Sequence, residues 1–122
     1  MNFGFLVLGS PFSSYSCHTA LDIVSACLKE GHSVHRVFFY QDAVLIGNKH
    51  IESVNSSDRC QESWQSLQRE YDLDLTLCIS AAQRRGISEL KQSDNVAEGF
   101  CISGLGQLIE ATLVCDRMVT VP

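Results

Sequence analysis

The stretch YDLDLTLCISAAQRRG, residues 71–86, decides how this chain folds. Leucines alternate with other side chains over residues 73–78, which is the period-two pattern of a β-strand. Helix-tolerant residues follow at 80–85, and Gly86 stands where a left-handed helix stop is expected. Cys78 therefore ends a strand just before a helix, which is where open α/β sheets keep their ligand sites. We expect the rest of the chain to hold and present this one sulfur atom.

The composition describes a single globular domain over residues 1–122. Hydrophobic residues make up 45 % and charged residues 19 %, which is typical of folded rather than disordered proteins. The net charge of −5 disfavours a free-standing nucleic-acid binder, since such proteins usually carry a basic face. No apolar run is long enough to span a bilayer. The apolar N-terminal stretch has no basic leader, so it predicts a first strand rather than a signal peptide, and a cytoplasmic protein in which disulfides are rare.

Strand and helix patterns alternate along the chain, which predicts a three-layer α/β fold with a mostly parallel sheet of about five strands. The strands are expected at residues 3–8, 34–40, 73–78, 100–103 and 117–121. The helices are expected at residues 15–30, 42–48, 58–71, 80–85 and 105–113. Binding loops are expected after the strands, at residues 9–14, 40–44, 78–85 and 103–106.

Helix ends and faces can also be predicted. Ser13 or Ser14 is expected to cap the first helix and Ser57 or Asp58 the helix at 58–71, while Gly31 ends the first. Apolar side chains at helical spacing predict a buried face on two of the helices. On the helix at 58–71 the face consists of Cys60, Trp64, Leu67 and Tyr71. On the helix at 105–113 it consists of Leu105, Leu108, Ile109, Thr112 and Leu113. The polar stretches 49–57 and 88–98 predict loops, the second of them a mobile surface segment.

Cys78 has a plain interpretation as a packed residue, because free cysteine is among the most buried residue types. Three features favour a reactive thiol instead: the change from strand to helix, the amides at the start of the helix, and the charges of Arg84 and Arg85 within the next turns. Amides and positive charges both stabilise a thiolate. Cys78 is therefore the candidate catalytic residue.

Two other activities remain open. Cys78 and Arg84 have the C-x5-R spacing of cysteine phosphatases, although the loop between them lacks glycine and no hydroxyl residue follows Arg84. The serine-rich loop at residues 9–14 suits a flavin phosphate, but helix capping also explains its serines. It has neither a dinucleotide-binding glycine pattern nor a phosphate-binding loop signature.

The pattern of the remaining cysteines and histidines does not indicate a catalytic or metal site. Cys17, Cys27 and Cys60 fall on apolar helix faces, Cys115 ends a helix, and the place of Cys101 stays open. The four histidines are scattered, and neither they nor the cysteines have the spacing of metal ligands.

Four segments together carry a resemblance to a known family. They are NFGFLVLGSPFSS at 2–14, FFYQDAV at 38–44, LCISAAQRRGI at 77–87 and GFCISGLGQLIEATLVCDRMV at 99–119. The chain resembles the sulfur-relay proteins of the DsrE/DsrF-like family, and most closely its TusD-like branch. The resemblance covers nearly the whole chain and implies a three-layer α/β fold.

The resemblance also implies a function. Cys78 matches the family's cysteine that carries sulfur as a persulfide. It implies a sulfurtransferase that pairs with TusB-like and TusC-like subunits in a hexamer of two heterotrimers. Sulfur arrives from a TusA-like donor, leaves to a TusE-like acceptor and ends in 2-thiouridine at the tRNA wobble position. A DsrE-like carrier in sulfur oxidation and a scaffold subunit with an inert Cys78 are the alternatives. Exchange between persulfides needs no metal or cofactor.

Overall fold

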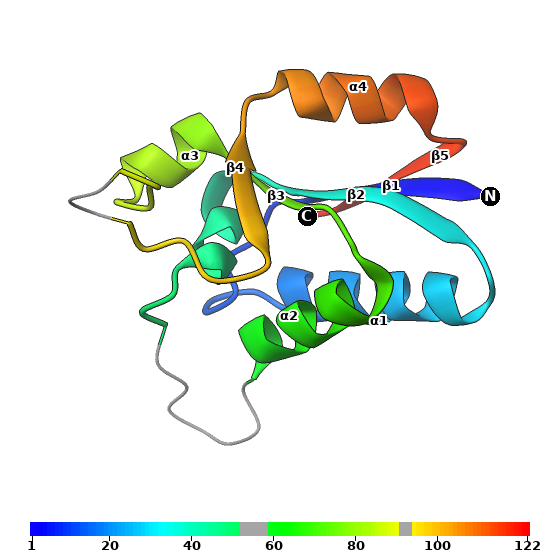
Figure 1. The fold of residues 1–122 in the computed structure, drawn as a ribbon, viewed down its shortest axis with the longest axis horizontal. Coiled ribbons are helices and arrows are strands. Elements are labelled where there is room, and N and C mark those ends of the chain that lie inside the picture. The colour runs from blue at the N-terminus through cyan, green and yellow to red at the C-terminus, as the bar shows by residue number, and fades with distance from the viewer. Residues whose placement is uncertain (52–58, 91–93) are drawn as a thin grey trace.

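The computed structural model describes residues 1–51, 59–90 and 94–122. One sheet holds five strands, and every neighbouring pair is parallel. The strands are β1 (Asn2–Val7), β2 (Ser33–Phe39), β3 (Leu75–Cys78), β4 (Phe100–Ser103) and β5 (Arg117–Val121). Their order across the sheet is β4-β3-β2-β1-β5 (Figure 1). The predicted parallel sheet of five strands is confirmed, with β4 and β5 at the predicted bounds.

Helices cover both faces of this sheet, as a three-layer α/β fold requires. The helices are α1 (Ser16–Lys29), the 3-10 helix η1 (Gln41–Gly47), α2 (Cys60–Tyr71), α3 (Ile79–Arg84) and α4 (Gly106–Val114). In Figure 1, α1 and α2 lie along one face, and α4 lies along the other with α3 beside the sheet's edge. In the part of the chain that the structure describes, no helix combines the length and apolar character needed to cross a bilayer.

The predicted helix ends at Gly31 and Gly86 are confirmed, but the predicted N-terminal cap of the first helix, Ser13 or Ser14, is wrong. Gly31 and Gly86 both have positive φ, at 87° and 76°. Tyr15 occupies the N-cap position of α1 and makes no side-chain cap. Ser14 Oγ instead accepts a bond of 3.0 Å from the amide of Ser16, because the chain turns once more before the helix begins. Ser57 and Asp58 lie outside the described residues.

The buried core lies mainly between the sheet and the pair α1 and α2. Trp64 is fully buried, and its ring packs edge-on against the ring of Phe39 with 5.3 Å between the ring centroids. Its Nε1 donates a hydrogen bond to the carbonyl of Cys17 at 3.2 Å. Cys60 and Leu67 are buried as predicted, but Tyr71 is 37 % exposed, because α2 ends there and the chain turns toward β3.

The segment after α3 is better anchored than its polar sequence predicts. The amide of Ala97 donates to the carbonyl of Gly47 at 2.7 Å, and the amide of Lys49 donates to the carbonyl of Asn95 at 2.8 Å. Ala97 itself is buried. Residues 94–98 therefore pack against the end of η1 and do not form a free surface loop.

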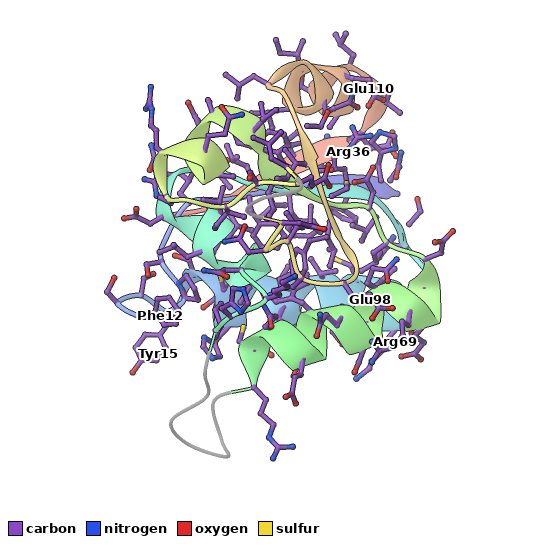
Figure 2. The ribbon with its side chains drawn as sticks, turned by 60° about the vertical axis from the view of Figure 1, so that its left-hand side comes forward. Phe12, Tyr15, Arg36, Arg69, Glu98 and Glu110 are labelled. Carbon is purple, nitrogen blue, oxygen red and sulfur yellow. The ribbon has the colours of Figure 1, made fainter. Side chains whose placement is uncertain are left out.

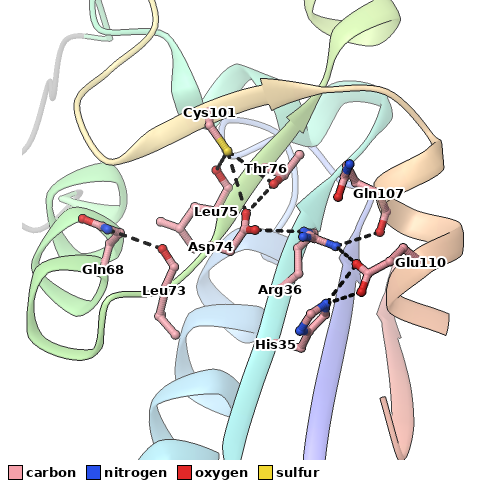
Figure 3. A network of polar contacts seen from close by, with 10 residues as sticks. All are labelled: His35, Arg36, Gln68, Leu73, Asp74, Leu75, Thr76, Cys101, Gln107 and Glu110. Atoms are coloured by element: carbon pink, nitrogen blue, oxygen red, sulfur yellow. Dashed lines mark hydrogen bonds and ion pairs between the residues drawn. The ribbon is translucent and has the colours of Figure 1, made fainter. Parts of the chain in front are cut away.

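A bulge in β2 brings two polar side chains to the same side of the sheet. The pairing of β1 with β2 passes from Phe3 opposite Val34 to Gly4 opposite Arg36, so His35 is an extra residue. Consecutive residues of a regular strand face opposite ways, and a bulge breaks that alternation. His35 and Arg36 consequently both point toward α4, as Figure 3 shows.

Arg36 is the centre of a polar network that joins β2, β3 and α4 (Figure 3). Its Nε donates to Asp74 Oδ2 at 3.0 Å, and its Nη1 donates to Glu110 Oε2 at 2.6 Å and to the Gln107 carbonyl at 2.9 Å. Burial lowers the pKa of Arg36, but the bonds with Glu110 and the attraction of Asp74 outweigh it and leave the pKa raised. The guanidinium stays charged and ties α4 to the sheet.

The predicted inner face of α4 is wrong at most of its positions: Leu108 packs against the core, but Thr112 is exposed. Only Ala111 is fully buried, whereas Leu105, Ile109 and Leu113 are 42 %, 61 % and 82 % exposed. Because Glu110 binds Arg36, the helix turns its charged side inward and these three residues outward. We call Leu105, Ile109 and Leu113 the outer stripe of α4.

Replacing Glu110 with Gln should reduce stability at neutral pH and matter less in acid. Hydrogen bonds from His35, and then from Arg36, lower the pKa of Glu110 in the folded state below its unfolded value of about 4.3. A lowered carboxylate pKa adds stability above the unfolded pKa, and this is lost as the pH falls through the folded pKa. The difference in unfolding free energy between wild type and Glu110→Gln, measured in urea, should therefore shrink as the pH falls below about 4.3. A constant difference from pH 7 to pH 3 would show that the charge of Glu110 is not what matters.

Candidate active site

The carboxyl ends of all five strands meet at one edge of the sheet, because every strand is parallel. The four predicted binding loops, at residues 9–14, 40–44, 78–85 and 103–106, leave the strands at this edge. It lies at the left of Figure 1, where α3 follows β3.

Cys78 is the last residue of β3 and the N-cap residue of α3. Its backbone is still extended, with φ −64° and ψ 124°, and Ile79 already belongs to the helix. Ser103 on β4 is its partner in the sheet register. The side chain of Cys78 is 0 % exposed. The predicted place at the strand-to-helix junction is confirmed, and the sulfur lies beneath the surface there.

Ser80 makes the side-chain contact with this sulfur. Its Oγ lies 3.4 Å from Cys78 Sγ, and either atom is able to donate the hydrogen bond. Ser80 is exposed on the first turn of α3. Ser80 was not predicted as a site residue, although a hydroxyl two positions after a cysteine at a helix start was a usable signal.

Arg84 and Arg85 were expected to add positive charge beside Cys78, but the structure places their charges elsewhere. Arg85 Nε and Nη2 donate to Asp42 Oδ1 at 3.0 and 2.8 Å, and Nη1 donates to the Ala81 carbonyl at 2.9 Å. Its charge is thus matched by a carboxylate on η1, and the ion pair fixes α3 beside the end of β2. Arg84 is exposed at the last turn of α3.

An apolar groove runs along α3. Its volume is about 200 Å³. The lining residues are Ile79, Gln83, Ser88, Glu89, Leu90 and Ile102. Ile79 directly follows Cys78, and Ile102 is the register partner of Leu77, so the groove is lined by chain neighbours of the junction and not by Cys78 itself.

Comparison with known proteins identifies the relatives of this chain. A model of the DsrE/DsrF-like family matches residues 1–121.

The chain belongs to the DsrE/DsrF-like family.

Relatives of this DsrE/DsrF-like chain include the sulfurtransferase TusD of Klebsiella pneumoniae subsp. pneumoniae, 36 % identical over 98 % of each chain. The TusD homolog of Vibrio vulnificus is 37 % identical over 98 % of this chain and 96 % of its own. Among solved structures, the ychN protein from E. coli superposes with a TM-score of 0.84 at 23 % identity, covering 98 % of both chains, which supports the fold. The predicted family and sulfurtransferase class are thereby confirmed.

The two other activities find no support in the geometry of this DsrE/DsrF-like chain. A phosphatase needs an open loop of amides between its cysteine and arginine, but Ile79–Arg84 is the helix α3. In the loop at residues 9–14, Ser10 Oγ accepts from the Phe12 amide and Ser14 bonds to Ser16, so these serines stabilise the turn itself.

Among the other cysteines, Cys17 and Cys60 have structural surroundings, whereas Cys101 is exposed. Cys17 and Cys60 are buried as predicted, and burial, followed by the nearness of Cys60, raises the pKa of the Cys17 thiol far above its usual value. Cys101 lies within β4, with Sγ 3.4 Å from Thr76 Oγ1. Burial of the sulfur also raises the pKa of Cys101 and of Cys115, which favours the neutral thiol.

Residues 1–51, 59–90 and 94–122 contain no cluster of three or more His, Cys, Asp or Glu side chains that could hold a metal ion.

Proposed function

We propose that this DsrE/DsrF-like protein carries sulfur as a persulfide on Cys78. The observation that carries the proposal is the position of Cys78, which ends β3 at the edge of the sheet where its strands present their loops. The family and the names of the relatives support a sulfur-transfer role. The contact with exposed Ser80 links this sulfur to the surface.

The proposed reaction is an exchange between persulfides. The Cys78 thiolate attacks the outer sulfur of a donor persulfide, a new S–S bond forms, and the bond inside the donor breaks so that the donor leaves as a thiolate. An acceptor thiolate then takes the outer sulfur from Cys78 in the same way. Each step moves one sulfur without net oxidation, and no cofactor is needed.

Sulfur transfer requires access to a sulfur that the chain alone buries completely. The cover over Cys78 includes α3, a helix of six residues with Ile79 and Ser80 exposed on its first turn. We expect the donor to approach along this turn and the adjoining groove, and α3 to shift when the new S–S bond forms.

The partners in this proposal are other subunits and two sulfur carriers. TusB-like and TusC-like subunits would complete a heterohexamer of two heterotrimers, and the uncharged outer stripe of α4 supplies an exposed apolar surface for such contacts. A TusA-like protein would give the sulfur and a TusE-like protein would receive it in the cytoplasm. The final product would be 2-thiouridine at the tRNA wobble position.

Reconstitution tests this pathway. A cysteine desulfurase, a TusA-like carrier, the B-type and C-type subunits and a TusE-like acceptor are combined with tRNA, with and without this protein. Labelled sulfur should reach the acceptor and then tRNA only when the protein is present. Label on the acceptor but not on tRNA would favour a carrier of the sulfur-oxidation type. Equal transfer without the protein would exclude the relay.

The burial of Cys78 favours one second candidate, a scaffold subunit with an inert thiol. In that case Cys78→Ser would leave transfer through the assembled complex unchanged. The same reconstitution, repeated with this variant, therefore separates the scaffold from the carrier.

A further inference from the structure

Cys78 and Ser80 form a pair in which the reactive atom is hidden and its partner is exposed. Cys78 Sγ has no exposed surface, whereas the residue that carries the hydroxyl 3.4 Å away is exposed. Ser80 thus joins the buried sulfur to solvent without opening the fold.

We propose that Ser80 ionises Cys78 and holds the resulting thiolate for sulfur transfer. This role presupposes that Cys78 carries the sulfur, as proposed above. Ser80 would be a catalytic residue in the strict sense, because its hydroxyl touches the atom at which the new S–S bond forms.

The direction of the hydrogen bond follows from the charge of the sulfur. A thiol can donate S–H to Ser80 Oγ, but a thiolate has no proton and only accepts, so the serine hydroxyl must then donate. The proton balance is simple: the S–H proton passes to Ser80 Oγ, and the hydroxyl proton of Ser80 passes to water. The sulfur is left as a thiolate that accepts an O–H bond, and no oxidant or reductant takes part.

The charged side chains on α3 and beside it are engaged elsewhere or exposed. Arg85 is bound to Asp42 and to the Ala81 carbonyl, and Arg84 is exposed at the far end of α3. Glu89 is exposed and lines the groove beside α3. The hydroxyl of Ser80 lies within hydrogen-bond distance of the sulfur, so it can stabilise the thiolate.

Three substitutions at one position separate the hydroxyl from the shape of the side chain. Ser80→Ala removes the hydroxyl, while Ser80→Thr and Ser80→Val have nearly the same shape and differ in that group. Ser66→Ala is the matched control, because Ser66 is an exposed helical serine on α2, on the opposite face of the sheet. Circular dichroism and the thermal midpoint establish that each variant is folded.

The first measurement is the thiolate absorbance of Cys78 against pH, taken as the difference from a Cys78→Ser background. Loss of a single hydrogen bond should raise the midpoint in Ser80→Ala and Ser80→Val by about half a unit to one unit. The second is the rate of sulfur loading at pH 7, which should fall about three- to tenfold in both variants. Ser80→Thr and Ser66→Ala should match the wild type.

The outcomes distinguish this inference from the proposed function. If Ser80→Thr and Ser80→Val had the same titration midpoint and the same rate of sulfur loading, the role of Ser80 would be overturned, even if the alanine variant failed to fold. A wild-type protein that takes up no sulfur would contradict the persulfide function, and the titration would still decide whether Ser80 holds the thiolate.

Discussion

Cys78→Ser should abolish sulfur loading while leaving the protein folded. A serine hydroxyl is far less acidic and less nucleophilic toward sulfur than a thiolate, so the rate should fall by at least ~1000-fold, as when a nucleophile is removed. The buried hydroxyl has Ser80 within reach as a partner, so the stability cost should be about 1 kcal/mol. The loss is measured as added mass after incubation with a loaded donor.

Two other cysteines provide matched controls for this variant. Cys101 lies on β4, the strand next to Cys78, and Cys115 follows α4. Cys101→Ser and Cys115→Ser should load sulfur at nearly the wild-type rate, because neither lies at the end of β3. Normal loading of Cys78→Ser, with loss in Cys101→Ser, would mean that the wrong cysteine has been assigned.

Arg36→Ala should produce a large loss of stability, although Arg36 lies outside the site. The change removes the cation that binds Asp74, Glu110 and the Gln107 carbonyl, and it leaves two carboxylates on the same face without their counter-charge. Removing one partner of a buried ion pair costs about 3–5 kcal/mol. Asp74 and Glu110 are 36 % and 41 % exposed and water can replace part of the bonding, so we expect about 2–3 kcal/mol.

Arg69→Ala is the control for this prediction. Arg69 lies on α2, away from the network under α4 in which Arg36 and Glu110 lie together (Figure 2). It is exposed and reaches Ser66 at 3.3 Å, so its loss should cost less than about 0.5 kcal/mol. Urea unfolding at pH 7 measures both variants. Similar midpoints for Arg36→Ala and Arg69→Ala would show that the network does not hold α4.

The sheet could be predicted from sequence because its signals are local. Alternating or continuous apolar runs mark the strands, and glycines at 31 and 86 mark helix ends through their positive φ. The place of Cys78 followed from the same local pattern, since a strand that changes directly into a helix puts its last residue at the edge of the sheet.

The features that were predicted wrongly or missed depend on residues far away in the sequence. The outer stripe of α4 was expected inside, but Glu110 binds Arg36, 74 positions earlier, and this contact sets which side of the helix faces the sheet. The bulge at His35 is likewise visible only in the register between two strands. Arg85 was expected to stabilise the thiolate, yet it forms an ion pair with the carboxylate of Asp42, 43 positions earlier.

The most direct test of the central claim is the intact mass of the wild-type protein after exposure to a desulfurase, cysteine and a loaded TusA-like carrier. We predict one added sulfur atom, mapped by peptide analysis to Cys78. An unchanged mass, with the donor shown to be loaded and the partner subunits present, would contradict it and leave Cys78 as a packed residue at the end of β3.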